Sequence, residues 1–254
     1  MTLNPLKAAT GSLLRDGVDH MKLGRIAVVG SLVAGLTAMA APAQAATQYC
    51  FGRRATKVGT TGPDRLFGSP YKTDVIVGLG GNDLISGGND YPENGDPPDF
   101  VCGGKGADEM YGGPGADRIS GGDGKDEIEG SFGSDVMDGD AGPDHVYDMD
   151  DEYEGIKDTL RGSRGDDVLR SDSGGDTYSG GFGNDRISDG WCFDPGRLFG
   201  GPGNDYFASY YSAPYGEGTC SKADADQVFG DSGIDTADLD RFDVTEMVER
   251  VTRH

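Results

Sequence analysis

The stretch from Gly103 to Glu129 reads GGKGADEMY GGPGADRIS GGDGKDEIE, which is one nine-residue pattern written three times. Each unit is Gly-Gly-x-Gly-x-Asp-x-apolar-x, and the pattern can be followed nearly without a break from Gly59 to Asp238. A fixed period over this length predicts a repeat architecture in which each unit stacks on its neighbours. Disordered acidic chains lack such a period, so the pattern argues against disorder.

The array resembles the haemolysin-type, or RTX, family of calcium-binding nonapeptide repeats. The resemblance implies an all-β fold, a parallel β-roll (a solenoid) with two repeats per coil, and Ca²⁺ as the bound ion. The chemistry of each position agrees with it. Glycines permit tight turns, the Asp is a hard oxygen ligand, and the x-apolar-x triplet is a short strand whose middle side chain points inward.

The middle residues of the triplets should form one thin core column. Almost all of them are apolar: Leu66, Ile76, Ile85, Val101, Met110, Ile119, Ile128, Met137, Val146, Leu160, Leu169, Tyr178, Ile187, Leu198, Phe207, Val228 and Ala237.

Successive turns of such a roll fall on opposite edges, and the two edges differ. The odd-numbered turns all have Gly at the first and fourth positions and Asp at the sixth, and we call them the regular edge; they begin at Gly59, Gly78, Gly103, Gly121, Gly139, Gly162, Gly180, Gly200 and Gly230. The even-numbered turns carry every insertion, and we call them the variable edge; they begin at Gly68, Gly87, Gly112, Gly130, Asp148, Ser171, Asp189 and Ser209. Insertions gathered on one face often mark a binding face, although they can equally be tolerated loops.

The regular edge should carry a column of carboxylates from the sixth position of each turn: Asp64, Asp83, Asp108, Asp126, Asp144, Asp167, Asp185, Asp205 and Asp235. At a spacing near 5 Å and an effective dielectric of ~20, neighbouring charges repel by roughly 3 kcal/mol. Summed along the column, this exceeds the usual net stability of a domain, about 5–15 kcal/mol. A cation must therefore neutralise it, and oxygen ligands on flexible loops favour Ca²⁺ over zinc or Mg²⁺. We expect one ion between each pair of stacked turns.

The variable edge keeps fewer of these features. Its corresponding carboxylates are Asp74, Asp99, Asp117, Asp135, Asp158, Asp176 and Asp226. Gly196 stands in place of Asp in one turn, and only the turns at Gly112 and Gly130 retain the full pattern. We therefore expect one complete calcium site on this edge, between those two turns.

The four cysteines suit an oxidising compartment. Cys192 and Cys220 fall in insertions of adjacent coils, so the coil spacing predicts a disulfide between them. Cys50 and Cys102 are then left for each other, although they lie about two coils apart. Metal-binding thiols are the alternative, but no Cys-x-x-Cys spacing is present.

The N-terminal residues have the features of an export signal. Residues 21–45 run from Lys22 and Arg25 through an apolar stretch to Ala43-Gln44-Ala45, which is typical of a secretory signal peptide. A membrane anchor is the alternative, but the apolar stretch is short for a span. We expect an extension of unclear role at 1–20, an N-terminal cap at 46–58, the repeat array at 59–238 and a C-terminal cap at 239–254, in a protein that is secreted and extracellular without a membrane span once the signal is removed.

Charge and composition limit the function. The net charge of −22 makes nucleic acid an improbable partner. The chain has 3 histidines, too few for most hydrolase sites, and we expect a binding or structural role rather than catalysis. The alternative is a carbohydrate-active or cell-surface glycan-binding protein, which would use acidic and aromatic residues of the variable edge such as Asp150, Glu152, Trp191 and Tyr211.

Overall fold

The computed structural model describes residues 47–88, 97–148, 156–172, 175–190, 195–209, 225–239 and 243–253. The proposed extension at 1–20 and signal at 21–45 lie outside these ranges, so nothing further is said of their structure. Among the described residues, all regular structure is β-strand, and none lies in a helix able to cross a membrane.

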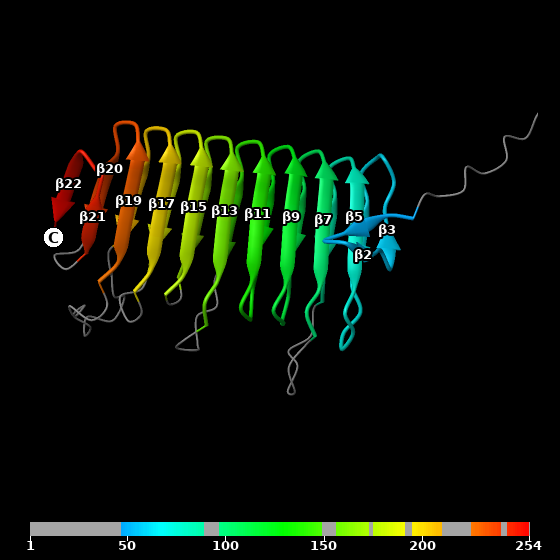
Figure 1. Ribbon diagram of the computed structural model, residues 1–254. Coiled ribbons are helices and arrows are strands. Elements are labelled where there is room, and N and C mark those ends of the chain that lie inside the picture. Colours follow the sequence, from blue (N-terminus) through cyan, green and yellow to red (C-terminus); the bar gives the residue numbers. More distant parts are fainter. Residues whose placement is uncertain are drawn as a thin grey trace, which may run out of the picture. The chain divides into compact units, whose positions relative to one another are not determined.

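In the described part of residues 45–254, two parallel sheets of ten strands each form the roll, and a two-stranded hairpin adds a third, small sheet (Figure 1). Strands of the first sheet lead into the turns of the regular edge: β3 (Lys57–Val58), β5 (Val75–Gly80), β7 (Phe100–Lys105), β9 (Arg118–Asp123), β11 (Val136–Ala141), β13 (Thr159–Arg164), β15 (Thr177–Phe182), β17 (Arg197–Pro202), β19 (Gln227–Ser232) and β21 (Val244–Glu246). Strands of the second sheet lead into the variable edge: β4 (Arg65–Phe67), β6 (Leu84–Ser86), β8 (Glu109–Tyr111), β10 (Glu127–Glu129), β12 (His145–Asp148), β14 (Val168–Ser171), β16 (Arg186–Asp189), β18 (Tyr206–Ser209), β20 (Thr236–Leu239) and β22 (Arg250–Arg253). Because the chain alternates between the sheets, each strand pairs with the strand two places later, and the fold is the predicted parallel β-roll.

The core is the predicted single column. In the first sheet Ile119 pairs with Met137, which pairs with Leu160, so equivalent repeat positions face each other across strands. Every column residue from Ile76 to Ala237 is fully buried, while Leu66 is only partly buried near the N-terminal end of the column. Leu239 and Val248 extend the column beyond the predicted residues. Each strand contributes one side chain to this core, which explains why the chain needs few apolar residues.

The fourth-position glycines allow the coils to stack closely. Gly142 has a φ of 137°, and a Cβ atom added there would lie 1.3 Å from the carbonyl oxygen of Gly124 in the preceding coil. Gly124 stands in the same relation to Gly106, at 1.5 Å. Figure 1 shows the result as a row of tight turns joining the sheets at the top of the view. Glycine is required here both for the backbone angle and for the contact.

The C-terminal segment continues the roll. β21 pairs with β19 and β22 pairs with β20, so residues 243–253 add a further coil to both sheets. The sequence predicts a C-terminal cap at 239–254, and within it the structure forms two strands, β21 (Val244–Glu246) and β22 (Arg250–Arg253).

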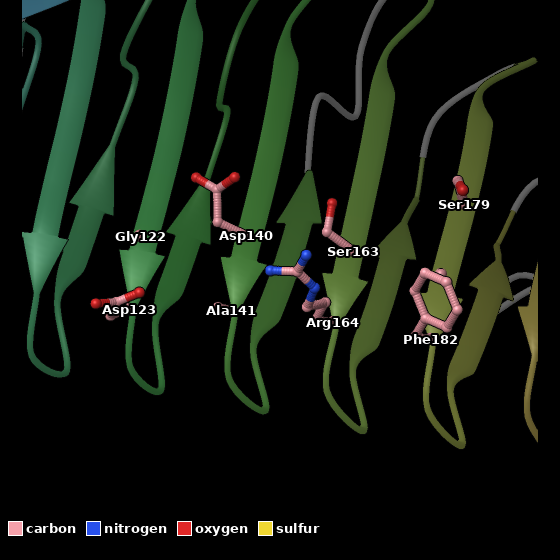
Figure 2. A pocket seen from close by; sticks show the side chains of 9 residues that line it. Gly122, Asp123, Asp140, Ala141, Ser163, Arg164, Ser179 and Phe182 are labelled. Carbon is pink, nitrogen blue, oxygen red and sulfur yellow. The ribbon is translucent and has the colours of Figure 1, made fainter.

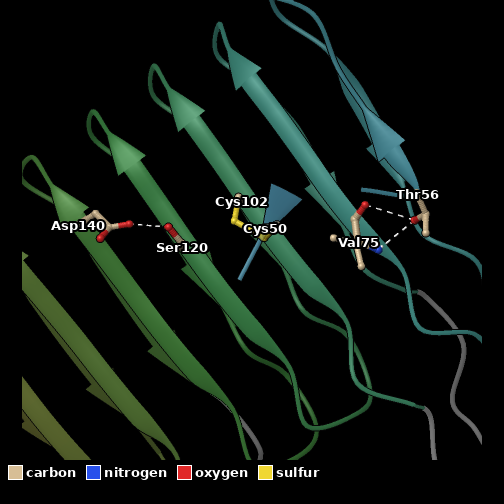
Figure 3. The surroundings of a disulfide bond; sticks show 6 residues. All are labelled: Cys50, Thr56, Val75, Cys102, Ser120 and Asp140. Atoms are coloured by element: carbon tan, nitrogen blue, oxygen red, sulfur yellow. Dashed lines mark hydrogen bonds between the residues drawn. A yellow bond between two sulfur atoms is a disulfide. The ribbon is translucent and has the colours of Figure 1, made fainter. Parts of the chain in front are cut away.

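An N-terminal hairpin lies against the outer side of the first sheet. β1 (Tyr49–Cys50) and β2 (Arg53–Arg54) pair in antiparallel fashion, and a disulfide joins Cys50 to Cys102 on β7 (Figure 3). Cys50 packs in a small buried cluster with Val75, Val77 and Phe100. The guanidinium group of Arg53 lies 4.0 Å from the centre of the Phe100 ring. The hairpin crosses several strands, which explains how Cys50 reaches Cys102 from outside the array.

Candidate metal centre

The regular edge joins the predicted carboxylates into a continuous hydrogen-bonded ladder. The backbone N–H of each Asp donates to the Oδ1 atom of the equivalent Asp in the next coil, at 2.8 Å from Asp108 to Asp126 and 2.8 Å from Asp126 to Asp144. The ladder contains all nine predicted residues: Asp64, Asp83, Asp108, Asp126, Asp144, Asp167, Asp185, Asp205 and Asp235. One oxygen of each carboxylate from Asp83 to Asp235 is therefore committed to holding neighbouring coils together.

The second oxygens of this column receive no such donor. The Oδ2 atoms of eight of these residues are buried and accept no hydrogen bond from any described residue: Asp83, Asp108, Asp126, Asp144, Asp167, Asp185, Asp205 and Asp235. A buried, unsatisfied carboxylate oxygen is costly, and eight in register are far more than a protein normally tolerates. Their common position points to a shared missing ligand.

The surroundings of these oxygens are built from further oxygens. A Cβ atom placed on Gly121, the first residue of its turn, would lie 2.5 Å from Asp126 Oδ2 and 2.7 Å from the carbonyl oxygen of Gly139 in the next coil. The turn at Gly103 repeats this, with Asp108 Oδ2 at 2.5 Å and the Gly121 carbonyl oxygen at 2.7 Å. Any side chain would fill this space, whereas glycine leaves a cradle of carboxylate and carbonyl oxygens. Such a donor set suits Ca²⁺.

Burial strongly affects the titration of the column. It raises the pKa of Asp144 to about 7, although the N–H donated by Asp126 partly offsets the shift and the negative charges of Asp126, Asp167 and Asp140 add to it. Burial likewise raises the pKa of several others to between about 6 and about 7: Asp126, Asp167, Asp185 and Asp205. Without a cation the column therefore favours protonation, and a bound cation would keep it ionised.

The two ends of the regular ladder differ from its middle. At the start, Asp64 Oδ2 accepts hydrogen bonds from the N–H of Thr60 at 2.5 Å and from its hydroxyl at 2.9 Å. At the far end, the N–H of Asp235 donates to Glu249 Oε2 at 2.7 Å. The terminal turns are thus completed by polar groups of the chain itself.

On the variable edge a second ladder connects Asp74, Asp99, Asp117, Asp135, Asp158 and Asp176. The turn at Gly112, where we expected a complete site, has the same cradle as the regular edge. A Cβ atom on Gly112 would lie 2.7 Å from Asp117 Oδ2 and 2.6 Å from the carbonyl oxygen of Gly130. The turn at Gly87 is similar, with Asp99 Oδ2 at 2.6 Å and the Gly112 carbonyl oxygen at 2.3 Å.

At Gly196 the variable ladder has no carboxylate at the sixth position, but another one lies close by. A Cβ atom on Gly196 would lie 2.1 Å from Oδ2 of Asp189, the buried first residue of the same turn. The ladder then resumes, because the N–H of Gly196 donates to Asp226 Oδ1 at 2.8 Å. Compared with the regular pattern, this turn therefore has Asp189 at the first position, where glycine is usual, and Gly196 at the sixth, where Asp is usual.

A group of three buried carboxylates also lies on the variable edge. Ligand atoms of Asp135, Asp148 and Asp158 lie within 4.8 Å of one another, close enough to share one cation. Asp135 and Asp158 were predicted ligands, whereas Asp148 occupies the first position of its turn, where the repeat normally has glycine.

Sequence reasoning missed Asp148, Asp189, Asp243 and Glu249. Asp243 accepts the N–H of Asp226 at 3.1 Å and so continues the variable ladder, as Glu249 continues the regular one. A usable signal was present, because Glu249-Arg250-Val251 keeps the acid-x-apolar spacing of the repeat after its glycines have been lost.

The insertions of the variable edge fall mainly outside the described residues. Cys192 and Cys220 are among them, so their pairing stays a prediction, as do roles for Asp150, Glu152, Trp191 and Tyr211.

An open groove crosses four strands of the first sheet beside the regular edge (Figure 2). Its volume is about 700 Å³, and its lining includes Asp123, Asp140, Ser163, Arg164 and Phe182. Phe182 is 64% exposed, which is unusual for a large apolar residue. Figure 2 shows Arg164 and Phe182 at the same level of the neighbouring strands β13 and β15.

Comparison with known proteins agrees with the geometry. Residues 71–90, 111–146 and 156–187 match the family model of the RTX calcium-binding nonapeptide repeat, in 4 copies. No curated protein and no solved structure shows significant similarity to the chain.

Proposed function

This chain carries the repeats of the RTX calcium-binding family, and from that premise we propose that it is an exported protein whose β-roll folds around calcium ions. The role is binding or structural. The single observation that carries the proposal is the row of eight buried Oδ2 atoms on the regular edge, of which those of Asp83, Asp108, Asp126 and Asp185 share their cradle with a glycine carbonyl oxygen of the next coil.

The residues that would hold the ions follow from this geometry. On the regular edge the ligands are the Oδ2 atoms of Asp83 to Asp235 in the ladder, together with first-position glycine carbonyls. On the variable edge the cradles at Asp99 and Asp117 and the carboxylate group Asp135, Asp148 and Asp158 are the best supported. The bound ion would supply the positive charge that keeps the column ionised, while the protein supplies the fixed oxygen positions.

Export is supported by three features. The charged, apolar and small-residue order of 21–45 is typical of a secretory signal. The Cys50–Cys102 disulfide suits an oxidising compartment. Calcium is plentiful outside cells, where modules with affinities of about 10⁻⁴–10⁻³ M are filled.

The test uses the chain from residue 46 onward, which is the proposed mature protein. We expect it to lose most of its β-structure in excess chelator and to regain it on adding millimolar calcium, as measured by circular dichroism. Equilibrium dialysis should find several ions per chain. A spectrum that is the same in chelator and in calcium would contradict the proposal.

Glycan binding is a second candidate function. The sequence predicts it at the insertions of the variable edge, which lie mainly outside the described residues. Among the described residues, the groove beside the regular edge supports it, because this groove offers an exposed ring for stacking and charged groups for hydroxyl recognition. A glycan array with and without calcium, repeated with Phe182→Ala, tests this. Binding that survives the substitution would place the glycan elsewhere.

A further inference from the structure

The variable edge contains turns in which the chain satisfies its own carboxylates. Building on calcium binding at the regular edge, we propose that hydroxyl groups take the place of the ion at Asp176 and Asp226, so that these two carboxylates are satisfied without calcium. The regular edge would then need the ion, while the C-terminal part of the variable edge would not.

The clearest case is Ser209. It is the last residue of β18, is buried, and begins its turn as Gly200 begins the neighbouring regular turn. Its hydroxyl donates a hydrogen bond to Oδ2 of Asp226. The equivalent oxygen beside Gly200 is Oδ2 of Asp205, which accepts no hydrogen bond from any described residue.

Asp176 is held in the same way by two hydroxyl groups. Ser171, the fully buried last residue of β14, hydrogen-bonds to its carboxylate. The Tyr178 hydroxyl donates to Asp176 Oδ2 across 3.4 Å. Tyr178 is also the one hydroxyl-bearing residue in the described core column, where every other member is apolar. A hydroxyl group in this apolar column is explained if its role is to satisfy the carboxylate of Asp176.

A third turn uses a positive charge for the same purpose. The ammonium group of Lys57 lies 2.8 Å from Asp74 Oδ2, and the Thr56 hydroxyl donates to Asp74 Oδ1 at 2.8 Å. Three turns of the variable edge therefore share a protein donor at the carboxylate: a first-position serine in two of them, and Thr56 and Lys57 of the preceding coil in the third.

A hydroxyl in this position excludes the ion for a geometric reason. Its hydrogen points at the oxygen lone pair that a cation would use, and its side chain fills the space that a first-position glycine leaves open. The hydrogen bond also removes the penalty of a buried unsatisfied oxygen. Calcium, which needs six to eight oxygen ligands, then gains little from entering the turn.

The test restores glycine at these positions. Ser209→Gly, and Ser171→Gly combined with Tyr178→Phe, recreate the first-position glycine of the repeat and remove the hydroxyl donors, and each of these two variants should raise the number of calcium ions bound per chain by one in equilibrium dialysis. Ser188→Gly is the matched control, because Ser188 lies on β16 between Ile187 and Asp189 and not at the first position of a turn, and it should leave the number unchanged. Equal calcium counts in wild type and in both variants would overturn the inference while leaving calcium binding itself intact. A wild type that binds no calcium would instead refute the proposed function.

Amide hydrogen exchange of the wild-type protein, at the calcium concentration that restores half of its β-structure, gives a second test that needs no variant. The N–H of Asp158 donates to Asp176 Oδ1, and that of Gly196 donates to Asp226 Oδ1. Both should exchange about tenfold or more slowly than the N–H groups of Asp108 and Asp126, their counterparts on the regular edge. Similar rates at the two edges would overturn the inference.

Discussion

Asp126 performs two tasks with one carboxyl group. Its Oδ1 accepts the N–H of Asp108, and its Oδ2 faces the glycine cradle. The first task requires only an acceptor, whereas the second, if it is calcium binding, requires the negative charge. The two can therefore be separated by a substitution that keeps the shape of the side chain and removes the charge.

We expect Asp126→Asn to change stability in opposite directions in the two media. With calcium, the lost ligand should destabilise the protein by about 2 kcal/mol. In chelator, the β-structure that remains should increase, because the amide keeps the hydrogen bond but removes a buried charge that neighbouring carboxylates repel. Circular dichroism measures both, by thermal unfolding with calcium and by the β-structure signal in chelator.

The control for this change is Asp123→Asn, since that side chain lies in the same turn but is 67% exposed. It should alter stability by less than about 0.5 kcal/mol in either medium. A loss of equal size with and without calcium for D126N would mean that the charge serves only the fold.

Each element of the roll is a strand with a turn, and its stacking depends on the fourth-position glycine. Gly142→Ala forces a Cβ into the carbonyl of Gly124 at a positive φ, so it should destabilise the calcium-loaded protein by about 3 kcal/mol or more. Gly62→Ala is the matched control, because the nearest atom to its added Cβ would be 4.0 Å away. Urea unfolding should find the control close to wild type; similar losses for both would remove close stacking as the reason for these glycines.

The N-terminal hairpin is an element held by one covalent bond. Cys50 and Cys102 are separated by 52 residues, and closing a loop of that length restricts the unfolded chain by about 4 kcal/mol. A Cys50→Ser/Cys102→Ser variant should therefore be less stable by up to about 4 kcal/mol, with exchange of the β5 and β7 amides increased first. Uniform loss of protection along the roll would show that the hairpin does not protect these coils selectively.

The same elements show how far sequence reasoning reaches. The core column was predicted because acid and apolar residues keep a fixed spacing, and this spacing alone determines which side chain points inward. The coil formed by β21 and β22 was not identified, since its glycines are gone and only Glu249 and Val251 retain the spacing. The sequence could not predict either that Asp189, at the first position of its turn, supplies the carboxylate that Gly196 lacks at the sixth. This depends on which side chain reaches the space beside Gly196 in the folded chain.

For the molecule as a whole, a fall in pH should stabilise the fold without calcium and destabilise it with calcium. The raised pKa values of about 6 to 7 mean that the folded, metal-free column binds protons more tightly than the unfolded chain, whose Asp groups titrate near 4. The stabilisation of the metal-free fold by these bound protons is complete below pH ~4 and is lost as pH rises through about 7. Metal-free protein should therefore gain β-structure when acidified from pH 7.5 to 5.

With calcium the sign reverses, because protons compete with the ion for the same oxygens. The β-structure content in metal-free buffer and the melting temperature in calcium-containing buffer, each measured at pH 5, 6 and 7.5, should give two curves of opposite slope. Parallel curves would indicate that the regular column does not control the pH response.

The ladder of shared carboxylates has a consequence for how the transition spreads. Each regular-edge Asp receives an amide from one coil and donates its own to the next, so the order of one coil depends on that of its neighbours. A linear array coupled in this way behaves as a one-dimensional Ising chain, in which a boundary between ordered and disordered segments carries an energetic penalty. Calcium concentration then plays the part that temperature plays in a helix–coil transition, and the steepness of the response measures how many coils change state together. In the second ladder this coupling is interrupted at Gly196, because glycine offers no carboxylate to the coil before it. An ordered segment that grows along the roll should therefore pause at this coil.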